Sequence, residues 1–283
     1  MNLKIDAKIR SRIKAALQED LGKSGDITSL WTIPDQMHGK AEIISRTSGV
    51  VCGVTVVEKV FACLDKSVET DFSVSDGDRV KSEQVVATIS GSMRSILAGE
   101  RTALNYLTHL SGIASLTRRF VDLASPFGVS VLDTRKTTPL LRTLEKHAVV
   151  CGGGKNHRMG LYDMVLIKDN HIAAVGGVRQ AIRAAKASRE NEDIQIEVEV
   201  STIQEARIAA EEGVDIILLD NMTPAIVRDA VEVIAGMAEV EVSGGITLEN
   251  VHDYAITGID RVSIGSLTHS VHALDMSLEI VQN

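Results

Sequence analysis

The sequence predicts an α/β fold in which repeated strand–helix units follow a smaller α+β domain. Six segments rich in Val and Ile are expected to be strands, at residues 129–136, 163–169, 194–200, 214–220, 238–243 and 259–265. Nearly continuous apolar character is typical of parallel strands that are buried on both faces. Helical patterns lie between these segments, at residues 140–150, 178–189, 203–212, 225–235 and 248–255. Repeats of this length indicate a βα barrel or an open doubly wound sheet.

The ends of the expected strands favour the barrel. Each strand finishes in charged, polar or glycine residues, namely Arg135-Lys136, Lys168, Glu199, Asp220, Ser243-Gly244-Gly245 and Gly265-Ser266. The carboxyl ends of barrel strands meet at one rim, where such proteins carry out their chemistry. Helix caps and solvated loops also place polar residues at single strand ends. Six ends of complementary chemistry are less easily explained in that way.

Helix starts and the first hundred residues complete the expected order of elements. Thr202 with Glu205 fits a capping box, and Thr223-Pro224 places proline at a first helical position. The N-terminal part is expected to form short strands at 41–45, 50–53, 69–74 and 85–90, with helices at 7–21 and 54–64. A longer helix is expected at 98–110. The last fifteen residues complete no further strand–helix unit, so we expect them to pack on the first domain.

Composition excludes several classes of function. The formal charge is −8 and aromatic residues make up 3% of the chain, which argues against binding of nucleic acid. No apolar run is long enough to span a bilayer, and the first residues lack the apolar core of a signal peptide. Cys52, Cys63 and Cys151 are odd in number and lack metal-ligand spacing, which indicates free or buried thiols. We therefore expect a cytoplasmic protein.

A cationic stretch within this acidic chain indicates a site for a small anion. Between residues 133 and 171 lie seven permanent cations, Arg135, Lys136, Arg142, Lys146, Lys155, Arg158 and Lys168. Scattered lysines are usually solvated surface residues. Lys136 and Lys168 differ because each directly follows an apolar strand. We therefore expect these two lysines, with Arg135, His157 and Arg158, to bind carboxylates or phosphates.

The other strand ends suggest complementary roles. Glu199 and Asp220 end neighbouring strands and are suited to a divalent cation or to vicinal hydroxyls, although they could also be structural partners of the lysines. Glu197 faces the same side as Glu199 but lies further from the rim. The glycines after the last two strands suit a phosphate held by backbone N–H groups, and His269 could add a donor.

Several longer motifs resemble the quinolinate phosphoribosyltransferase family, also called carboxylating nicotinate-nucleotide diphosphorylase. The resemblance covers nearly the whole chain, and its motifs are Gly25-Asp26-Ile27-Thr28, Gly99-Glu100-Arg101-Thr102-Ala103-Leu104-Asn105, Asp133-Thr134-Arg135-Lys136-Thr137-Thr138-Pro139, Asn156-His157-Arg158, Lys168-Asp169-Asn170-His171, Leu219-Asp220-Asn221 and Gly265-Ser266-Leu267-Thr268-His269. Two positions depart from the family pattern, since Leu140 replaces a frequent Gly and His147 a frequent Tyr.

The resemblance implies an N-terminal α/β sandwich domain at 1–112 and an incomplete α/β barrel at 113–267, with residues 268–283 packing on the first domain. It implies a homodimer or higher homo-oligomer with shared active sites. The implied reaction joins quinolinate to phosphoribosyl pyrophosphate (PRPP) and gives nicotinate mononucleotide, pyrophosphate and carbon dioxide, in de novo NAD biosynthesis. Mg²⁺ is the implied cofactor, and no organic cofactor, nucleic acid or membrane is implied.

The resemblance also assigns site residues. Quinolinate would be bound by Arg135, Lys136, His157, Arg158 and Lys168, with Arg101 contributed by the partner subunit. PRPP would be bound by Lys168, Glu199, Asp220, Ser243, Gly244, Gly245, Gly265 and His269. The catalytic residues would be Lys136, Lys168, Glu199 and Asp220, and the last two would serve Mg²⁺, directly or through water.

Three alternatives stay open at this point. A related phosphoribosyltransferase that does not decarboxylate, or a paralogue associated with molybdenum transport, would share much of this pattern. Residues 76–91 resemble part of a biotinyl or lipoyl carrier domain, although the modifiable Met-Lys-Met turn is absent. A phosphate-binding barrel isomerase would not need so many cations for a second, carboxylate-bearing ligand.

Overall fold

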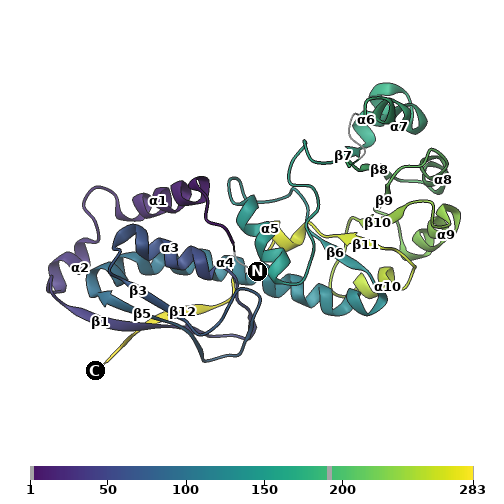
Figure 1. Cartoon of the computed structure of the whole chain (residues 1–283). Coiled ribbons are helices and arrows are strands. Elements are labelled where there is room, and N and C mark those ends of the chain that lie inside the picture. The colour runs from purple at the N-terminus through teal and green to yellow at the C-terminus, as the bar shows by residue number, and fades with distance from the viewer. Residues whose placement is uncertain (1–2, 190–192, 283) are drawn as a thin grey trace. The chain divides into compact units, whose positions relative to one another are not determined.

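The computed structural model describes residues 3–189 and 193–282 and divides into two compact units (Figure 1). The first unit contains residues 1–116, 143–153 and 271–283, and the second contains residues 117–142 and 154–270. Segment 143–153 thus belongs to the first unit, although the expected barrel range of 113–267 includes it. Residues 1, 2 and 283 of the expected domain ranges lie outside the described residues.

An antiparallel four-stranded sheet forms the base of the first unit. Its strand order is β12-β1-β5-β3, with bounds Met276–Val281, His38–Ser45, Gln84–Ser92 and Glu69–Phe72. β12 pairs with β1, so the C-terminal strand completes the N-terminal sheet. Figure 1 shows helices α1 (Ala7–Leu21) and α3 (Val54–Leu64) on the same side of this sheet. Their apolar faces are buried, including Ile13 and Phe61, which accounts for much of the core of this unit.

Short elements connect the main parts of the first unit. Helix α2 spans Ile27–Thr32, and strands β2 (Gly49–Val50) and β4 (Arg79–Val80) form a separate two-stranded ribbon. Asp26 caps α2, because its carboxylate accepts hydrogen bonds from the backbone N–H groups of Thr28 and Ser29. Capping explains why the Gly-Asp-Ile-Thr motif occurs at this point.

Helix α4 (Met93–Ala124) is longer than the expected helix at 98–110. Ser111 and Gly112, which follow the expected end of the helix, are packing sites within α4. A Cβ atom on Gly112 would lie 2.3 Å from the carbonyl oxygen of His272, so only glycine allows this approach. Ser111 exchanges hydrogen bonds with the backbone of Cys52, which donates its N–H at 3.0 Å and accepts at 3.2 Å. These contacts explain why small residues interrupt the helical pattern.

A six-stranded parallel sheet forms the second unit, in the order β6-β11-β10-β9-β8-β7. The strands span Ser130–Leu132, Arg261–Ser263, Glu239–Ser243, Ile216–Asp220, Ile196–Val200 and Val165–Ile167. Among the described residues β6 and β7 do not pair with each other, so the ring is open between them. The prediction of an α/β fold with an incomplete barrel is confirmed.

Helices cover the outer side of the open barrel (Figure 1). They are α6 (Asp169–Val175), α7 (Val178–Ala187), α8 (Ile203–Glu211), α9 (Pro224–Ile234) and α10 (Val251–Ala255). A 3-10 turn spans Ser125–Phe127, and α11 (Ser266–His269) follows β11, where its Thr268 hydroxyl donates to the Lys136 carbonyl. The capping box of Thr202 and Glu205 is present, and Pro224 is the first residue of α9. Helix α5 (Arg142–Cys151) belongs to the first unit.

Across residues 3–189 and 193–282, none of the helices combines enough length with enough apolar character to span a bilayer.

Candidate active site

The carboxyl ends of the barrel strands surround a cavity of about 500 Å³ in the second unit. Its charged and polar lining consists of Thr134, Arg135, Lys136, His157, Arg158, Lys168, Glu199, Asp220, Asn221, Ser243, Gly244, Gly245 and Ser263. Leu166 and Leu218 supply apolar surface. Most of the residues expected to form the site therefore lie around one space, although they come from distant parts of the chain.

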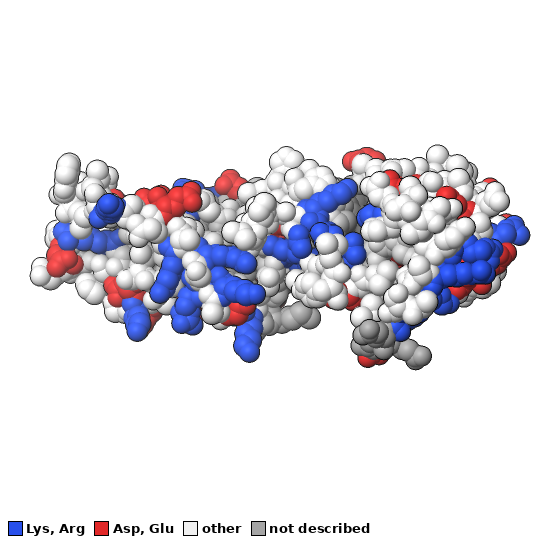
Figure 2. All heavy atoms as spheres, turned by 90° about the horizontal axis from the view of Figure 1, so that it is seen from above, with Lys and Arg blue, Asp and Glu red and all other residues white. Residues whose placement is uncertain are grey.

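Four of the seven cations in residues 133–171 line this cavity, namely Arg135, Lys136, Arg158 and Lys168. The other three, Arg142, Lys146 and Lys155, do not line it. Arg142 supports the loop after β6, since its guanidinium donates to Thr137 Oγ1 and to the Met159 carbonyl, both at 3.0 Å. Lys146 is buried in α5 of the first unit. Figure 2 shows the basic side chains gathered in separate groups on one face of the protein.

Two arginines at the cavity repel each other. Partial burial, together with the positive charge of Arg135, lowers the pKa of Arg158 below its usual range. The Arg158 guanidinium donates to the Met164 carbonyl at 3.2 Å, which holds it beside the cavity. An anionic ligand between the two guanidinium groups would relieve this repulsion, and a carboxylate matches their planar geometry.

Lys168 links the end of β7 to the end of β8. Its ammonium forms an ion pair and a hydrogen bond with the Glu199 carboxylate. The backbone N–H of Lys168 donates to His171 Nδ1 at 3.0 Å, which fixes the chain at the start of α6. The Lys168-Asp169-Asn170-His171 motif thus positions the lysine from within the same turn.

Lys136 is held through its backbone. Its N–H donates to Thr134 Oγ1 at 3.0 Å, and its carbonyl accepts from the Thr268 hydroxyl at 2.7 Å. A Cβ atom on Gly265 would lie 3.0 Å from Lys136 Cδ and 3.1 Å from His269 Nε2. Gly265 and His269 therefore lie beside the Lys136 side chain, at the point where β6 and β11 end.

The ends of β9 and β10 are joined by Asn221. Its side-chain amide donates to Asp220 Oδ2 at 2.7 Å, and its backbone N–H donates to the Ser243 carbonyl at 3.0 Å. Gly244 has φ +94°, and a Cβ there would lie 2.2 Å from Asn221 Oδ1. Glycine is required at this position for both reasons. The hydrogen bond from the Asn221 amide orients the Asp220 carboxylate, which lines the cavity.

A buried group of His157, Glu197 and Glu241 adjoins the cavity. His157 Nδ1 accepts the backbone N–H of Arg158 at 2.8 Å, so the proton of a neutral imidazole lies on Nε2. Nε2 is 3.0 Å from Glu197 Oε2 and 3.5 Å from Glu241 Oε1. Burial and the Glu197 carboxylate raise the pKa of Glu241 to about 8.

Arg101 belongs to the first unit and is not among the residues that line the cavity. It is on α4, its side chain is 65% exposed, and it forms an ion pair with Glu100 at 3.9 Å. The expected role of Arg101 depends on a second subunit, and it stays a prediction.

Comparison with known proteins decides the family. Residues 26–111 match the family model for the N-terminal domain of quinolinate phosphoribosyl transferase, and residues 113–279 match its C-terminal domain. This chain belongs to the quinolinate phosphoribosyl transferase family.

Individual relatives agree in sequence and fold. The chain is 42% identical to quinolinate phosphoribosyltransferase [decarboxylating] 1b of Nicotiana tabacum, over 96% of this chain and 82% of that protein. It is 41% identical to a probable nicotinate-nucleotide pyrophosphorylase [carboxylating] of Bacillus subtilis, over 93% and 90%. The crystal structure of NadC from Streptococcus pyogenes superposes with a TM-score of 0.94, at 42% identity and complete coverage of both chains.

Sequence patterns placed the carboxylates of this family member only in part. The sequence favours Glu199 over Glu197 as the site residue because it lies nearer the rim; in the structure Glu199 lines the cavity and Glu197 is buried. Glu241 was not anticipated. A usable signal was present, because Glu197 and Glu199 in β8 and Glu239 and Glu241 in β10 are spaced two residues apart in otherwise apolar strands.

The raised pKa of Glu241 predicts a pH-dependent effect of the substitution E241Q. The folded protein holds a proton on Glu241 up to about pH 8, whereas the unfolded chain releases it near pH 4.5. The wild type should therefore lose stability relative to E241Q as the pH rises through this window, by on the order of a few kcal/mol. Urea unfolding of both proteins at intervals from pH 5 to 9 measures the difference. Parallel stability profiles would contradict the prediction.

Proposed function

We propose that this protein transfers a phosphoribosyl group from PRPP to quinolinate and releases pyrophosphate and carbon dioxide, giving nicotinate mononucleotide in de novo NAD biosynthesis. The observation that carries the proposal is the cavity itself, where four cations and two carboxylates meet at the ends of parallel strands. Membership of the family supports the same conclusion. The cavity therefore suits two anionic substrates that must react with each other.

Quinolinate has two adjacent carboxylates on a pyridine ring, which matches the cationic side of the cavity. Arg135 and Arg158 are proposed to bind these carboxylates, because each guanidinium can pair with two oxygens. Lys136 and His157 lie at the same end of the sheet and would complete the binding site. Lys168 would stand between the two substrates, since it already bridges toward Glu199.

PRPP is proposed to bind on the carboxylate side. Glu199 and Asp220 would accept hydrogen bonds from the ribose hydroxyls. Their oxygens are also donors that Mg²⁺ prefers, so they could hold this ion with water and substrate phosphate completing its shell. Mg²⁺ would neutralise charge on the pyrophosphate. The backbone at Ser243, Gly244 and Gly245, with Gly265 and His269, is proposed to hold the 5′-phosphate.

The proposed chemistry needs positioning more than a reactive side chain. Departure of pyrophosphate leaves positive charge on the ribose ring, and the carboxylates of Glu199 and Asp220 stabilise that charge. The pyridine nitrogen forms the new bond to the ribose carbon. The resulting pyridinium stabilises the carbanion left on the ring carbon when the adjacent carboxylate departs as carbon dioxide, and a proton from water then replaces the lost carboxylate. The protein contributes mainly by holding two mutually repelling anions together.

The test is release of carbon dioxide from quinolinate in the presence of PRPP and Mg²⁺, with nicotinate as the control substrate. Carbon dioxide and nicotinate mononucleotide in equal amounts are expected from quinolinate only. Product from nicotinate without carbon dioxide would favour a phosphoribosyltransferase that does not decarboxylate. Absence of both products from folded protein would overturn the substrate assignment.

Substitution of either central lysine should abolish turnover without unfolding the protein. Lys136→Ala and Lys168→Ala each remove a cation that lines the cavity, so we expect kcat to fall by about 100-fold or more. Lys155→Ala is the matched control, because Lys155 lies in the same cationic stretch but does not line this cavity. Steady-state rates, with circular dichroism as a check on folding, make the comparison. A rate near that of the wild type would remove the role of that lysine.

We also propose a dimer in which Arg101 of the partner subunit completes each site. Arg101→Ala and Lys136→Ala should each be inactive alone, whereas mixed dimers would contain one site with neither substitution. If the subunits pair at random after dissociation and mixing, about half of the dimers are mixed and each has one intact site of two. The mixture should therefore recover up to about a quarter of the wild-type activity. Mixed dimers verified by mass that remain inactive would contradict this arrangement.

A cytoplasmic location is proposed from the three cysteines, which are all free thiols in the structure. Some plant relatives carry names that place them in mitochondria or chloroplasts, as in Nicotiana tabacum and Arabidopsis thaliana. Fluorescent tagging of the full chain in its own cell would test the proposal.

A further inference from the structure

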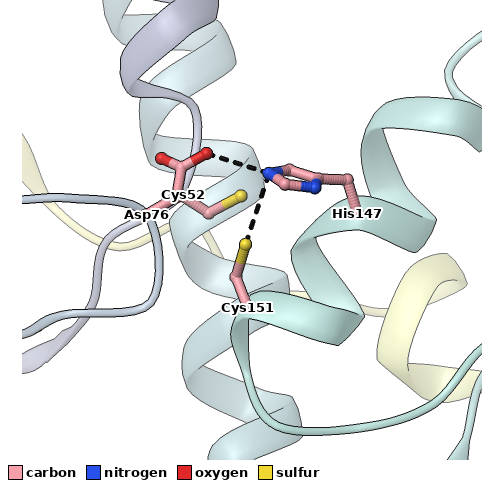
Figure 3. A group of neighbouring side chains, drawn as sticks. All are labelled: Cys52, Asp76, His147 and Cys151. Atoms are coloured by element: carbon pink, nitrogen blue, oxygen red, sulfur yellow. Dashed lines mark hydrogen bonds and ion pairs between the residues drawn. The ribbon is translucent and has the colours of Figure 1, made fainter. Parts of the chain in front are cut away.

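A second cluster of reactive side chains lies in the first unit and shares no residue with the proposed active site. Cys52 follows β2, Asp76 lies in the turn before β4, and His147 and Cys151 lie one helical turn apart on α5 (Figure 3). One ligand atom from each residue lies within 4.8 Å of the other three. The two cysteines are buried, and the side chains of His147 and Asp76 are 9% and 6% exposed.

The contacts in this cluster converge on a single ring nitrogen. His147 Nε2 is 2.9 Å from Asp76 Oδ2 and 3.4 Å from Cys151 Sγ (Figure 3). One nitrogen carries at most one proton and cannot give a full hydrogen bond to both groups. The arrangement also differs from a nucleophilic triad, in which the carboxylate and the nucleophile contact opposite ring nitrogens. A positive ion at the centre would satisfy all the groups together.

We propose that Cys52, Asp76, His147 and Cys151 form a tetrahedral site for a zinc ion. Zinc bond lengths place the ligand atoms of such a site about 3.4 to 3.8 Å from one another. The His147–Cys151 distance of 3.4 Å already approaches this value. The His147 Nε2–Asp76 Oδ2 pair, at 2.9 Å, would have to open, and the other atoms, which lie within 4.8 Å of one another, would have to close by about 1 Å or less.

The ligand types select the metal. Two thiolates with an imidazole favour zinc over magnesium or calcium, which bind oxygen ligands. A site with four protein ligands and little exposure is a closed, structural site. Zinc binding at this site would therefore require neither the Mg²⁺ nor the substrates proposed for the barrel cavity.

Neighbouring groups already orient the ligands. The second oxygen of Asp76 accepts hydrogen bonds from the backbone N–H groups of Gly53 at 2.8 Å and Val54 at 3.0 Å. These groups begin helix α3, whose positive end offsets part of the carboxylate charge. The backbone of Cys52 is held by Ser111 of α4. Such outer contacts fix ligand geometry at metal sites.

Zinc would join three segments that lie far apart in the sequence. Cys52 precedes α3, Asp76 belongs to the loop between β3 and β4, and α5 enters the first unit as a separate stretch of residues 143–153. Because the ion would bind the folded chain and not the unfolded one, it would add directly to the stability of this unit.

The test is the metal content of the full-length protein and its variants. Elemental analysis should find about one zinc per chain, and Co²⁺ added to chelator-treated protein should give thiolate-to-cobalt charge-transfer absorption. C52S, C151S and H147Q should each weaken zinc binding by more than the roughly 10- to 100-fold typical of outer-shell changes. Removal of zinc by a chelator should lower the unfolding temperature of the wild type.

The controls separate this site from other sources of metal binding. C63S replaces the third cysteine, which lies on α3 outside the cluster, and should bind zinc as the wild type does. D220N alters the barrel cavity and should also retain zinc. Zinc lost in D220N but kept in C151S would overturn the proposal. Wild-type protein that binds no Co²⁺ after reduction would also overturn it. A native mass lower by two hydrogens, which would show a disulfide between Cys52 and Cys151, would do the same.

Discussion

Parallel pairing of buried strands is the constraint on which the second unit depends. Ile217, Leu219, Val198 and Val242 are fully buried, and because side chains alternate along a strand they lie on the face opposite to Glu197, Asp220 and Glu241. The register sets Ser243 of β10 opposite Asp220 of β9 and Val200 of β8 opposite Leu219. The carboxyl ends of β8, β9 and β10 therefore lie side by side at the same edge of the sheet. The polar residues at these ends line a common cavity.

Cations line the rim of that cavity, and acidic side chains lie beside them and in the buried part of the barrel. Arg135, Lys136, Arg158 and Lys168 supply positive charge at the rim of a protein whose formal charge is −8. Glu199 pairs with Lys168, and below the rim His157 contacts Glu197 and Glu241. Because Glu241 is protonated up to about pH 8, it adds no negative charge beneath the rim at neutral pH, and the rim cations stay available to anionic substrates.

The first unit uses polar residues in a different way. Its cluster joins sulfur, nitrogen and oxygen atoms in a closed setting, whereas the barrel cavity presents arginine, lysine and carboxylate groups to a space of about 500 Å³. Closed sites with thiolate ligands favour structural metals, and open sites with charged groups favour substrates. The two clusters therefore divide stability and chemistry between the two units.

One departure from the family pattern has a structural explanation. Leu140 adopts φ +67°, a left-handed conformation in which glycine avoids a cost of about 1 kcal/mol. The glycine expected at this place suits the backbone of the loop rather than the chemistry of the site. Leu140 is exposed, so the substitution removes no charge or contact from the cavity.

Local patterns were sufficient for the helices at 7–21 and 54–64, for the strand–helix alternation, and for the charged residues at strand ends, because periodicity and caps are short-range properties. They were insufficient for the full length of α4, which continues past the expected end at residue 110 and packs Gly112 against His272. They also could not show that Lys146 is buried in the first unit, that Glu241 meets His157, or that Cys52 meets Cys151. Each of these depends on contacts between residues distant in the chain, and such contacts form only when the elements pack together.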